Sequence, residues 1–202
     1  MRKSELQSVC VALIAALAVN FTPRSVHAQS EISDDVLWKE LDTDGDKVYR
    51  NGNYSEAERL WLAALRVAER FGPEDGRLAI SLGFLAELYQ AQSRYSEAEP
   101  FQKRALSIEE KILGSEYPNV ATSLNNLAEL YRVQDRYAEA EPLHKRAIAI
   151  VEKAVGPEHP NVATFLENYA ALLRRTNREA EAMKLEARVK AIRAKQAQST
   201  PK

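Results

Sequence analysis

The sequence predicts an all-α fold, a solenoid of about four helical hairpins wound into a right-handed superhelix. Three observations support this prediction. The chain repeats internally with a period of 42 residues, apolar residues recur at helical spacing within each repeat, and glycine and proline stand where helices would end and begin. No segment shows the alternating pattern of a half-buried strand. The length of 202 residues suits one ordinary domain or a short repeat array.

The composition excludes several classes of protein. The formal net charge is −1, without the basic excess expected of a nucleic-acid-binding protein. A single cysteine, Cys10, excludes a disulfide framework and any cysteine-based metal cluster. With 45% hydrophobic residues, 7 Gly and 8 Pro, the chain is neither disordered nor fibrous in character. A soluble, helix-rich protein remains.

The N-terminus has the three-part pattern of a secretory signal peptide. A positive start at residues 2–3 is followed by an uninterrupted apolar run at 9–19, and residues 26–28 place small side chains before a cut preceding Gln29. A membrane anchor is the alternative. The apolar run would span only about 16 Å, roughly half of a bilayer core. We therefore expect a signal peptide at 1–28, no stable membrane insertion, and a periplasmic or secreted mature chain.

The rest of the chain is organised by its repeats. Residues 79–118 align without gaps with residues 121–160, and 24 of these 40 positions are identical. Weaker copies begin near Tyr54 and Arg178. Degraded end units are expected, because the terminal faces of a stacked array meet water. The expected organisation is a short linker at 29–35, an array at 36–198 with hairpins at about 36–72, 77–114, 119–156 and 161–196, and a disordered tail at 199–202.

The first helix of each unit is predicted from its apolar spacing. In the second unit Leu82, Leu85, Ala86 and Tyr89 lie at positions i, i+3, i+4 and i+7, which is one face of a helix. The third unit repeats this spacing and the fourth nearly does. In the first unit the helical stripe consists of Trp38, Leu41, Gly45 and Val48.

The second helix of each unit is predicted in the same way, from Ala98, Phe101, Ala105 and Ile108 in the second unit. A proline near its start should cost little, whereas a proline in mid-helix costs about 3 kcal/mol or more. A glycine should cap its end, and a further proline should begin the next hairpin. The residues in these roles are Pro100 and Pro142, Gly114 and Gly156, and Pro118 and Pro160.

These residues resemble the tetratricopeptide repeat. The period exceeds the usual one of about 34 residues. Together with the segment at 156–163 it is similar to the long, kinesin-light-chain-type repeat, which also occurs in exported bacterial proteins unrelated to kinesin. Gln102 and His144 depart from the pattern, since an aromatic residue is usual there, and Asp44 stands where leucine is usual. The matching positions are Leu82, Leu85, Ala86, Tyr89, Ala98 and Ala105, then Leu124, Leu127, Ala128, Tyr131, Ala140 and Ala147, with Tyr54, Ala57, Trp61 and Ala64 in the first unit.

Residues 42–46 look like the start of a calcium loop, but the loop needs Gly at its sixth position and Glu at its twelfth. Lys47 and Asn53 occupy those positions, so we interpret the carboxylates as a solvated helix face or as an acidic patch for a partner. His144 and His159 have no third ligand at zinc spacing. No metal and no cofactor are expected.

The Glu-Ala-Glu segments recur once in each hairpin and therefore belong to the repeat pattern, not to an acid–base pair. Arg104 and Arg146 are candidates for pairing with carboxylates of neighbouring helices. No phosphate loop or nucleophile motif occurs, so we do not expect an enzyme.

The resemblance implies that the first helices line a concave groove, which binds a protein or peptide. In related repeats an asparagine there often hydrogen-bonds the main chain of the bound peptide, which makes Asn125, Asn126 and Asn168 candidates. The groove would be acidic toward its N-terminal end and basic toward its C-terminal end. The predicted groove residues are Asp42, Asp46, Tyr49, Arg50, Gly83, Glu87, Gln90, Asn125, Asn126, Glu129, Arg132, Glu167, Asn168, Arg174 and Arg175.

The expected function is that of a non-catalytic scaffold or adaptor. The alternative is an assembly subunit that associates with itself, or with an envelope complex, through its convex face or end helices. An enzyme without a recognisable motif is a third hypothesis. The last helix, at about 178–196, is interpreted as a polar cap on the stack, with a membrane-contacting basic helix as the competing interpretation.

Overall fold

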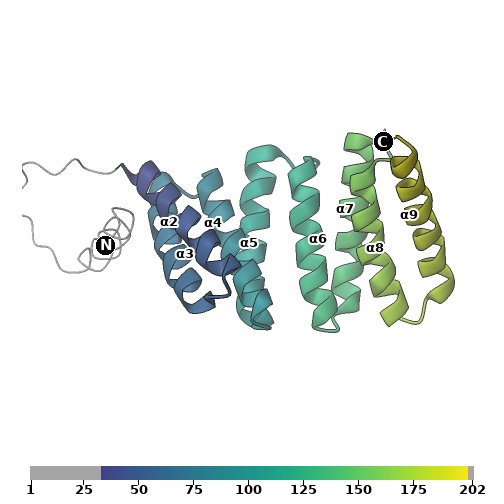
Figure 1. The fold of residues 1–202 in the computed structure, drawn as a ribbon, viewed down its shortest axis with the longest axis horizontal. Coiled ribbons are helices and arrows are strands. Elements are labelled where there is room, and N and C mark those ends of the chain that lie inside the picture. Colours follow the sequence, from purple (N-terminus) through teal and green to yellow (C-terminus); the bar gives the residue numbers. More distant parts are fainter. Residues whose placement is uncertain (1–32, 200–202) are drawn as a thin grey trace, which may run out of the picture.

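The computed structural model describes residues 33–199. The predicted signal peptide and most of the predicted tail lie outside these residues. The described part is helical, without strands (Figure 1). Its elements are α2 (Asp34–Arg50), α3 (Tyr54–Ala68), the short 3₁₀ helix η1 (Glu69–Phe71), α4 (Gly76–Ala91), α5 (Tyr95–Leu113), α6 (Pro118–Val133), α7 (Tyr137–Val155), α8 (Pro160–Arg175) and α9 (Glu179–Ser199).

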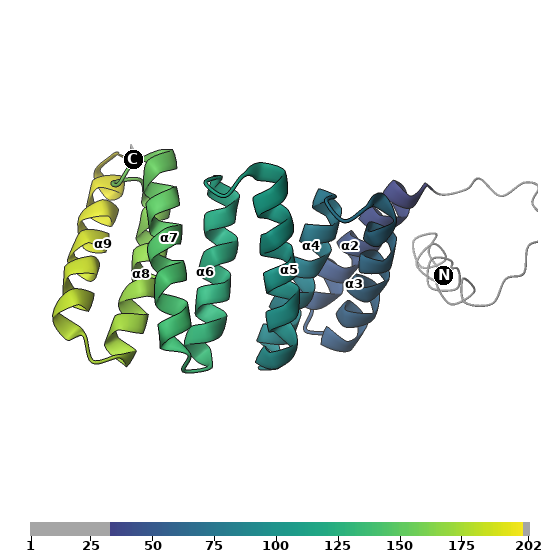
Figure 2. The ribbon, with the colours of Figure 1, turned by 180° about the vertical axis from the view of Figure 1, so that it is seen from behind.

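Consecutive helices pair into hairpins, α2 with α3, α4 with α5, α6 with α7 and α8 with α9. The hairpins stack side by side in chain order into an elongated array, with α2 and α9 at opposite ends (Figures 1 and 2). The predicted all-α solenoid of four hairpins is confirmed. Between residues 33 and 199, no helix combines the length and apolar character that crossing a membrane requires.

Each hairpin turns at a residue with a left-handed backbone. Gly52 has φ 75°, while Ser93 and Asp135 have φ 58° and Asn177 has φ 59°. Small or polar side chains tolerate this region best. The N–H group that follows the turn then bonds back to the end of the first helix, as Arg94 N does to Tyr89 O at 2.8 Å. The turn therefore fixes how the two helices of a hairpin meet.

The caps between hairpins agree with the sequence prediction. Gly114 and Gly156 end α5 and α7 with φ of 91° and 88°, and Pro118 and Pro160 are the first residues of α6 and α8. The prediction for Pro100 and Pro142 was only partly right.

Because α5 begins at Tyr95, Pro100 is its sixth residue, past the first turn, and Pro142 holds the same place in α7. Each proline therefore removes one hydrogen bond within its helix, to the carbonyl group of Ser96 or of Ala138. Ser96 and Ala138 are both exposed.

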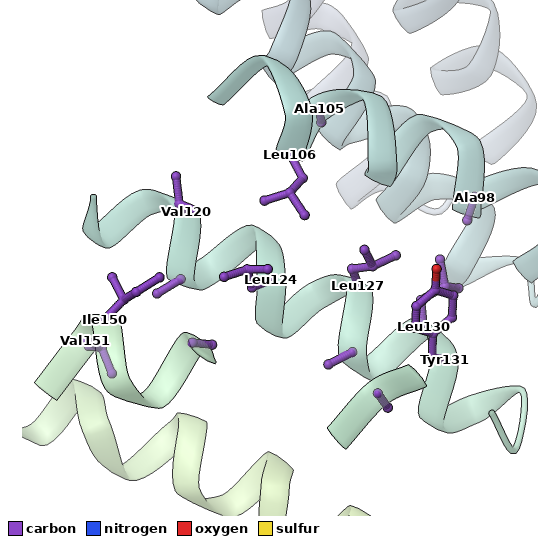
Figure 3. Close-up of a cluster of buried hydrophobic side chains, with 14 of the residues drawn as sticks. Ala98, Ala105, Leu106, Val120, Leu124, Leu127, Leu130, Tyr131, Ile150 and Val151 are labelled. Carbon is purple, nitrogen blue, oxygen red and sulfur yellow. The ribbon is translucent and has the colours of Figure 1, made fainter. Parts of the chain in front are cut away.

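The core runs the length of the array, between the hairpins as well as within them. Figure 3 shows Leu106 of α5 pointing toward α6, where Leu124 and Leu127 lie, and Ile150 approaching α6 from α7. The alanines of the repeat, such as Ala98, are fully buried. A small side chain there lets neighbouring helices approach closely, so each hairpin completes the core of the next.

Ionic contacts recur between successive hairpins. Arg104 and Arg146 do pair with carboxylates, as expected: Arg104 with Glu69 at 3.1 Å and Arg146 with Glu110 at 2.7 Å. Both carboxylates belong to the preceding hairpin. These pairs are largely exposed, so each contributes about 1 kcal/mol or less.

A second recurring contact was not predicted. At each junction a tyrosine hydroxyl donates to a glutamate of the preceding hairpin, and an arginine pairs with the same carboxylate. We call this set the inter-hairpin clamp. Its three copies are Tyr89 and Arg94 on Glu58, Tyr131 and Arg136 on Glu99, and Tyr169 and Arg178 on Glu141.

Candidate partner-binding groove

All the predicted groove residues lie on the first helices of the hairpins, α2, α4, α6 and α8. The structure brings four of them into one pocket of about 460 Å³ between α4, α5 and α6. Gly83, Glu87 and Gln90 come from α4, and Asn126 comes from α6. The pocket therefore joins predicted groove residues of two successive hairpins.

The floor of the pocket comes from α5, which the sequence analysis did not assign to the groove. Gln102, Ala105 and Glu109 line it. Gln102 is only 4% exposed and donates from Nε2 to the carbonyl oxygen of Ser123 at 3.4 Å. The departure of Gln102 from the usual aromatic residue was the one sequence signal for this floor.

Glu109 is the most unusual group of the floor. Its Oε2 atom is buried and has no hydrogen-bond partner. Burial raises the pKa of Glu109, because the charged form loses hydration there, although Ser123 partly opposes this shift. An unpaired buried carboxylate oxygen has a free-energy cost, which a cationic or hydrogen-bond-donating group would reduce.

Residue 83 of the pocket lining has no side chain. A Cβ atom added at Gly83 would meet no atom within 4 Å. With the repeat offset of 42, the equivalent residues are Asn125 in α6 and Glu167 in α8. A side chain therefore occupies this position in the two following hairpins, whereas in α4 the position has none.

One side of the pocket is apolar. Ile80 is 46% exposed, and Phe84 is partly buried. The ring of Phe84 stacks on Trp61 with centroids 5.1 Å apart and an interplanar angle of 8°. Trp61 also contacts Tyr49 of α2, at 5.3 Å between centroids. These ring contacts connect α2, α3 and α4 beside the pocket.

Tyr49 and Glu87, two predicted groove residues from different hairpins, face each other. Burial, together with the nearby carboxylate of Glu87, raises the pKa of Tyr49 to about 12. The hydroxyl therefore stays protonated and can donate to Glu87.

On α2, Asp46 and Arg50 form an exposed ion pair at 2.9 Å. Asp42 is half-buried, and its Oδ1 atom has no hydrogen-bond partner. Burial and, secondarily, the charge of Asp46 raise the pKa of Asp42 to about 6. Residues 42–46 belong to this helix rather than to a loop, and the described part of the chain has no group of three or more His, Cys, Asp or Glu side chains placed to hold a metal ion.

The groove residues of α6 differ in accessibility. Asn126 is exposed, whereas Asn125 is only 8% exposed and its Oδ1 has no partner. Glu129 and Arg132 form an ion pair at 2.8 Å, and the buried His144 of α7 lies 3.4 Å from Glu129. Of the two asparagines, Asn126 is therefore the one that a partner could readily reach.

The groove residues of α8 are occupied by contacts within the chain. Glu167 pairs with Arg193 at 2.7 Å, Arg174 pairs with Glu186 at 2.7 Å, and Arg175 pairs with Asp135 at 3.3 Å. Asn168 is half-buried. The basic end expected from the sequence is therefore largely neutralised, mainly by the last helix.

Comparison with known proteins is consistent with this architecture. A family model described as tetratricopeptide repeat matches residues 48–111, 77–150 and 119–195. The crystal structure of BtubC (BKLC) from P. vanneervenii aligns with a TM-score of 0.77 and 21% identity, over 96% of this chain and 75% of that one. The crystal structure of a putative kinesin light chain from Podosopora anserina, with nearly identical TPR-like repeats, aligns with a TM-score of 0.71 and 25% identity, over 94% of this chain and 86% of that one. No curated protein is significantly similar in sequence.

Proposed function

The chain belongs to the tetratricopeptide repeat family, and on that premise we propose that it is a non-catalytic adaptor that binds an extended peptide or protein segment along α2, α4 and α6. The observation that carries this proposal is the pocket between α4 and α6. It combines exposed polar groups, Glu87 and Asn126, with an exposed apolar side chain, Ile80. A pocket that combines apolar surface with a few polar groups is typical of a ligand-binding site, and these exposed side chains contribute little to the stability of the fold.

The surrounding charges support the same proposal. Most carboxylates at the hairpin junctions have a cationic partner, as in the inter-hairpin clamps. Glu87 and Glu109 of the pocket form no ion pair with any described residue. Tyr49 can donate to Glu87, and Ser123 contacts Glu109, but the remaining acceptor sites of the two carboxylates are available to a ligand.

A second candidate function is assembly through the outer surface, as a self-associating subunit or as part of an envelope complex. A separate observation favours it. Apolar side chains are exposed where successive hairpins connect, with Ile112 at 43%, Tyr117 at 48% and Val155 at 39%. These residues lie at the ends of α5 and α7 and at the start of α6, away from the pocket. Exposed apolar groups at one edge are typical of a contact surface.

Affinity capture from an extract of the source organism separates the two functions. One variant, Thr122→Arg/Asn126→Arg, adds two long basic side chains to exposed groove positions of α6. The matched control, Ser107→Arg/Ala149→Arg, adds the same charges to exposed positions of α5 and α7. Ser107 lies across its helix from the pocket residue Ala105 at 100° per residue.

We expect the groove variant to lose a partner that wild type and control retain. Retention by the groove variant with loss by the control would instead support assembly through the outer surface.

We further propose that the chain is exported to the periplasm or secreted, and that it acts on protein rather than on nucleic acid. The support is the sequence pattern of the N-terminus and the absence of a basic excess. The test is to express the full chain in its source organism, fractionate the cells, and determine the N-terminal residue of the protein by sequencing. An N-terminus at Gln29 in the exported fraction is expected, and an uncut cytoplasmic chain would contradict export.

A further inference from the structure

Resting on the proposed groove function, we propose that the pocket between α4 and α6 binds a lysine or arginine side chain of an extended partner segment, with an apolar neighbour of that residue packed on Ile80. The proposal therefore specifies which kind of partner the groove selects. Four observations support it: the charge of the pocket, its depth, its apolar side and its single occurrence.

The pocket is acidic and has no cation of its own. Glu87 lies at its exposed side and Glu109 on its floor, and its lining contains no lysine, arginine or histidine. Arg50 is near enough for its pKa to be raised in part by Glu87, but it is paired with Asp46 at 2.9 Å. A ligand cation would therefore find two carboxylates that form no ion pair with a described residue, although Tyr49 can donate a hydrogen bond to Glu87.

The depth of the pocket suits a long side chain. The space beside Gly83 on α4 is open. The pocket has a volume of about 460 Å³ and reaches Gln102, Ala105 and Glu109 of α5, which form its floor. At this depth Glu109 Oε2 has no partner within the described chain. Charge-assisted hydrogen bonds from an ammonium or guanidinium group to such an oxygen are stronger than those between neutral groups.

The apolar side of the pocket complements the stem of the same side chain. Lysine and arginine bury their methylene groups along apolar surface while the charged head reaches a polar site. Ile80 and Phe84 provide that surface on α4, and an aromatic ring also attracts a nearby cation. An acidic or purely apolar ligand residue would leave the two carboxylates unpaired.

The combination occurs once in the described array. In the preceding hairpin, Trp61 occupies the position of Gln102 and fills the space with its ring. In the following one, Asn125 replaces Gly83 and His144 replaces Gln102, and both are buried. In the last hairpin the equivalent residues, Glu167 and Glu186, line a pocket that contains its own cations, Lys190 and Arg193. A single cation pocket would fix the register of a bound segment relative to the repeats.

Pools of short random peptides test the proposal. Each pool has one central residue fixed as lysine, arginine, glutamate or norleucine, the last being an uncharged mimic of the lysine stem. The immobilised full chain is exposed to each pool, and the retained fraction is measured. The variants are Glu87→Gln/Glu109→Gln, which removes both charges, and Gly83→Leu, which fills the opening. The matched control, Glu40→Gln, neutralises an exposed glutamate of α2 outside the pocket.

Wild type and Glu40→Gln should retain the lysine and arginine pools about tenfold better than the norleucine pool. Both pocket variants should lose this preference. The proposal is overturned if the wild type shows no preference for a cation, if it retains no pool, or if the pocket variants keep the preference. Absence of a cation preference in the wild type, together with continued capture of a groove-dependent partner, would refute this proposal alone. Failure of the arginine variants of α6 to affect capture would refute the groove function itself.

Discussion

Gly45 of α2 lies directly against the indole ring of Trp61 of α3. A Cβ atom added at residue 45 would be 2.5 Å from Cδ1 and 3.0 Å from Cε2 of that ring, so no side chain fits there. The contact explains a glycine inside a helix, where glycine is unfavourable. It also holds Trp61 in place for its stack with Phe84 at the edge of the pocket.

Gly45→Ala should destabilise the protein by about 1–3 kcal/mol, because the ring must move within a packed core. Gly83→Ala is the matched control, since the same methyl group there meets open space. It should be neutral or should stabilise the protein by up to about 1 kcal/mol through helix propensity. Urea denaturation followed by circular dichroism measures both. Equal effects of the two substitutions would contradict the close contact at Gly45.

The inter-hairpin clamps should make the protein sensitive to acid. The hydrogen bond from Arg136 is the main reason that the pKa of Glu99 falls from 4.5 to about 2, and Arg178 together with Lys145 lowers that of Glu141 to about 2. Because these pKa values are lowered on folding, their stabilisation is present above pH 4.5 and is lost as the pH falls toward 2. We expect a loss on the order of 2 kcal/mol for each of these two clamps, those of Glu99 and Glu141.

Glu99→Gln tests this account of the clamps. It should lower the free energy of unfolding at pH 7, and the difference from wild type should shrink as the pH falls toward 2 and below, where Glu99 becomes protonated in the folded state as well. Unfolding by urea at several pH values gives the comparison. A deficit that stays constant across the whole range would show that the ionisation of Glu99 contributes nothing.

Asp42 should have the opposite pH dependence. Its pKa is raised from 3.8 to about 6, so its contribution to stability is greatest below pH 3.8 and declines as the pH rises through 6. Asp42→Asn removes the charge with little change in shape. We expect it to stabilise the protein at pH 7 by on the order of 1 kcal/mol, allowing for solvent screening, and to make little difference near pH 3.5. Thermal unfolding of both proteins at the two pH values measures the difference. Lower stability of the variant than of the wild type at pH 7 would contradict the expected cost of ionising Asp42.

Glu109→Gln should raise the thermal stability of the free protein at pH 7. Burial raises the pKa of Glu109, so ionisation at neutral pH opposes folding, and the neutral amide removes that cost. A residue that lowers stability while lining a pocket is typical of a binding site. The matched control is Glu40→Gln, which should leave the melting temperature unchanged. Destabilisation by Glu109→Gln would mean that the carboxylate has a structural role.

The fold was predictable because two independent sequence signals mark the helices of each repeat. The spacing of apolar residues indicates the helices, and glycine and proline indicate where they end and begin. These signals are local, so they can be recognised without knowing how the helices pack. Examples are Gly114, Pro118 and the apolar stripe at Leu82 and Leu85. The clamps were not predictable in the same way. Tyr131 and Glu99 are 32 residues apart, and only the stacking of hairpins brings them together.

The candidate site was predictable in position but not in accessibility. Counting along the first helices selected Glu87, the resemblance to related repeats added Asn126, and the structure places both in a common pocket. The same counting could not tell that Asn125 is buried, or that Arg174 is held by Glu186 of the last helix. Those outcomes depend on which side chains the second helices present.

Site-specific photocrosslinking is the most direct test of the claim that the groove holds the partner. A photoreactive amino acid is introduced at Asn126 in one protein and at Ser107 in another, both exposed positions on adjacent helices. After irradiation in the source organism, adducts are identified by mass spectrometry. We expect a partner protein crosslinked from residue 126 and not from residue 107. The same partner crosslinked only from residue 107, or only a second copy of the chain, would contradict the account.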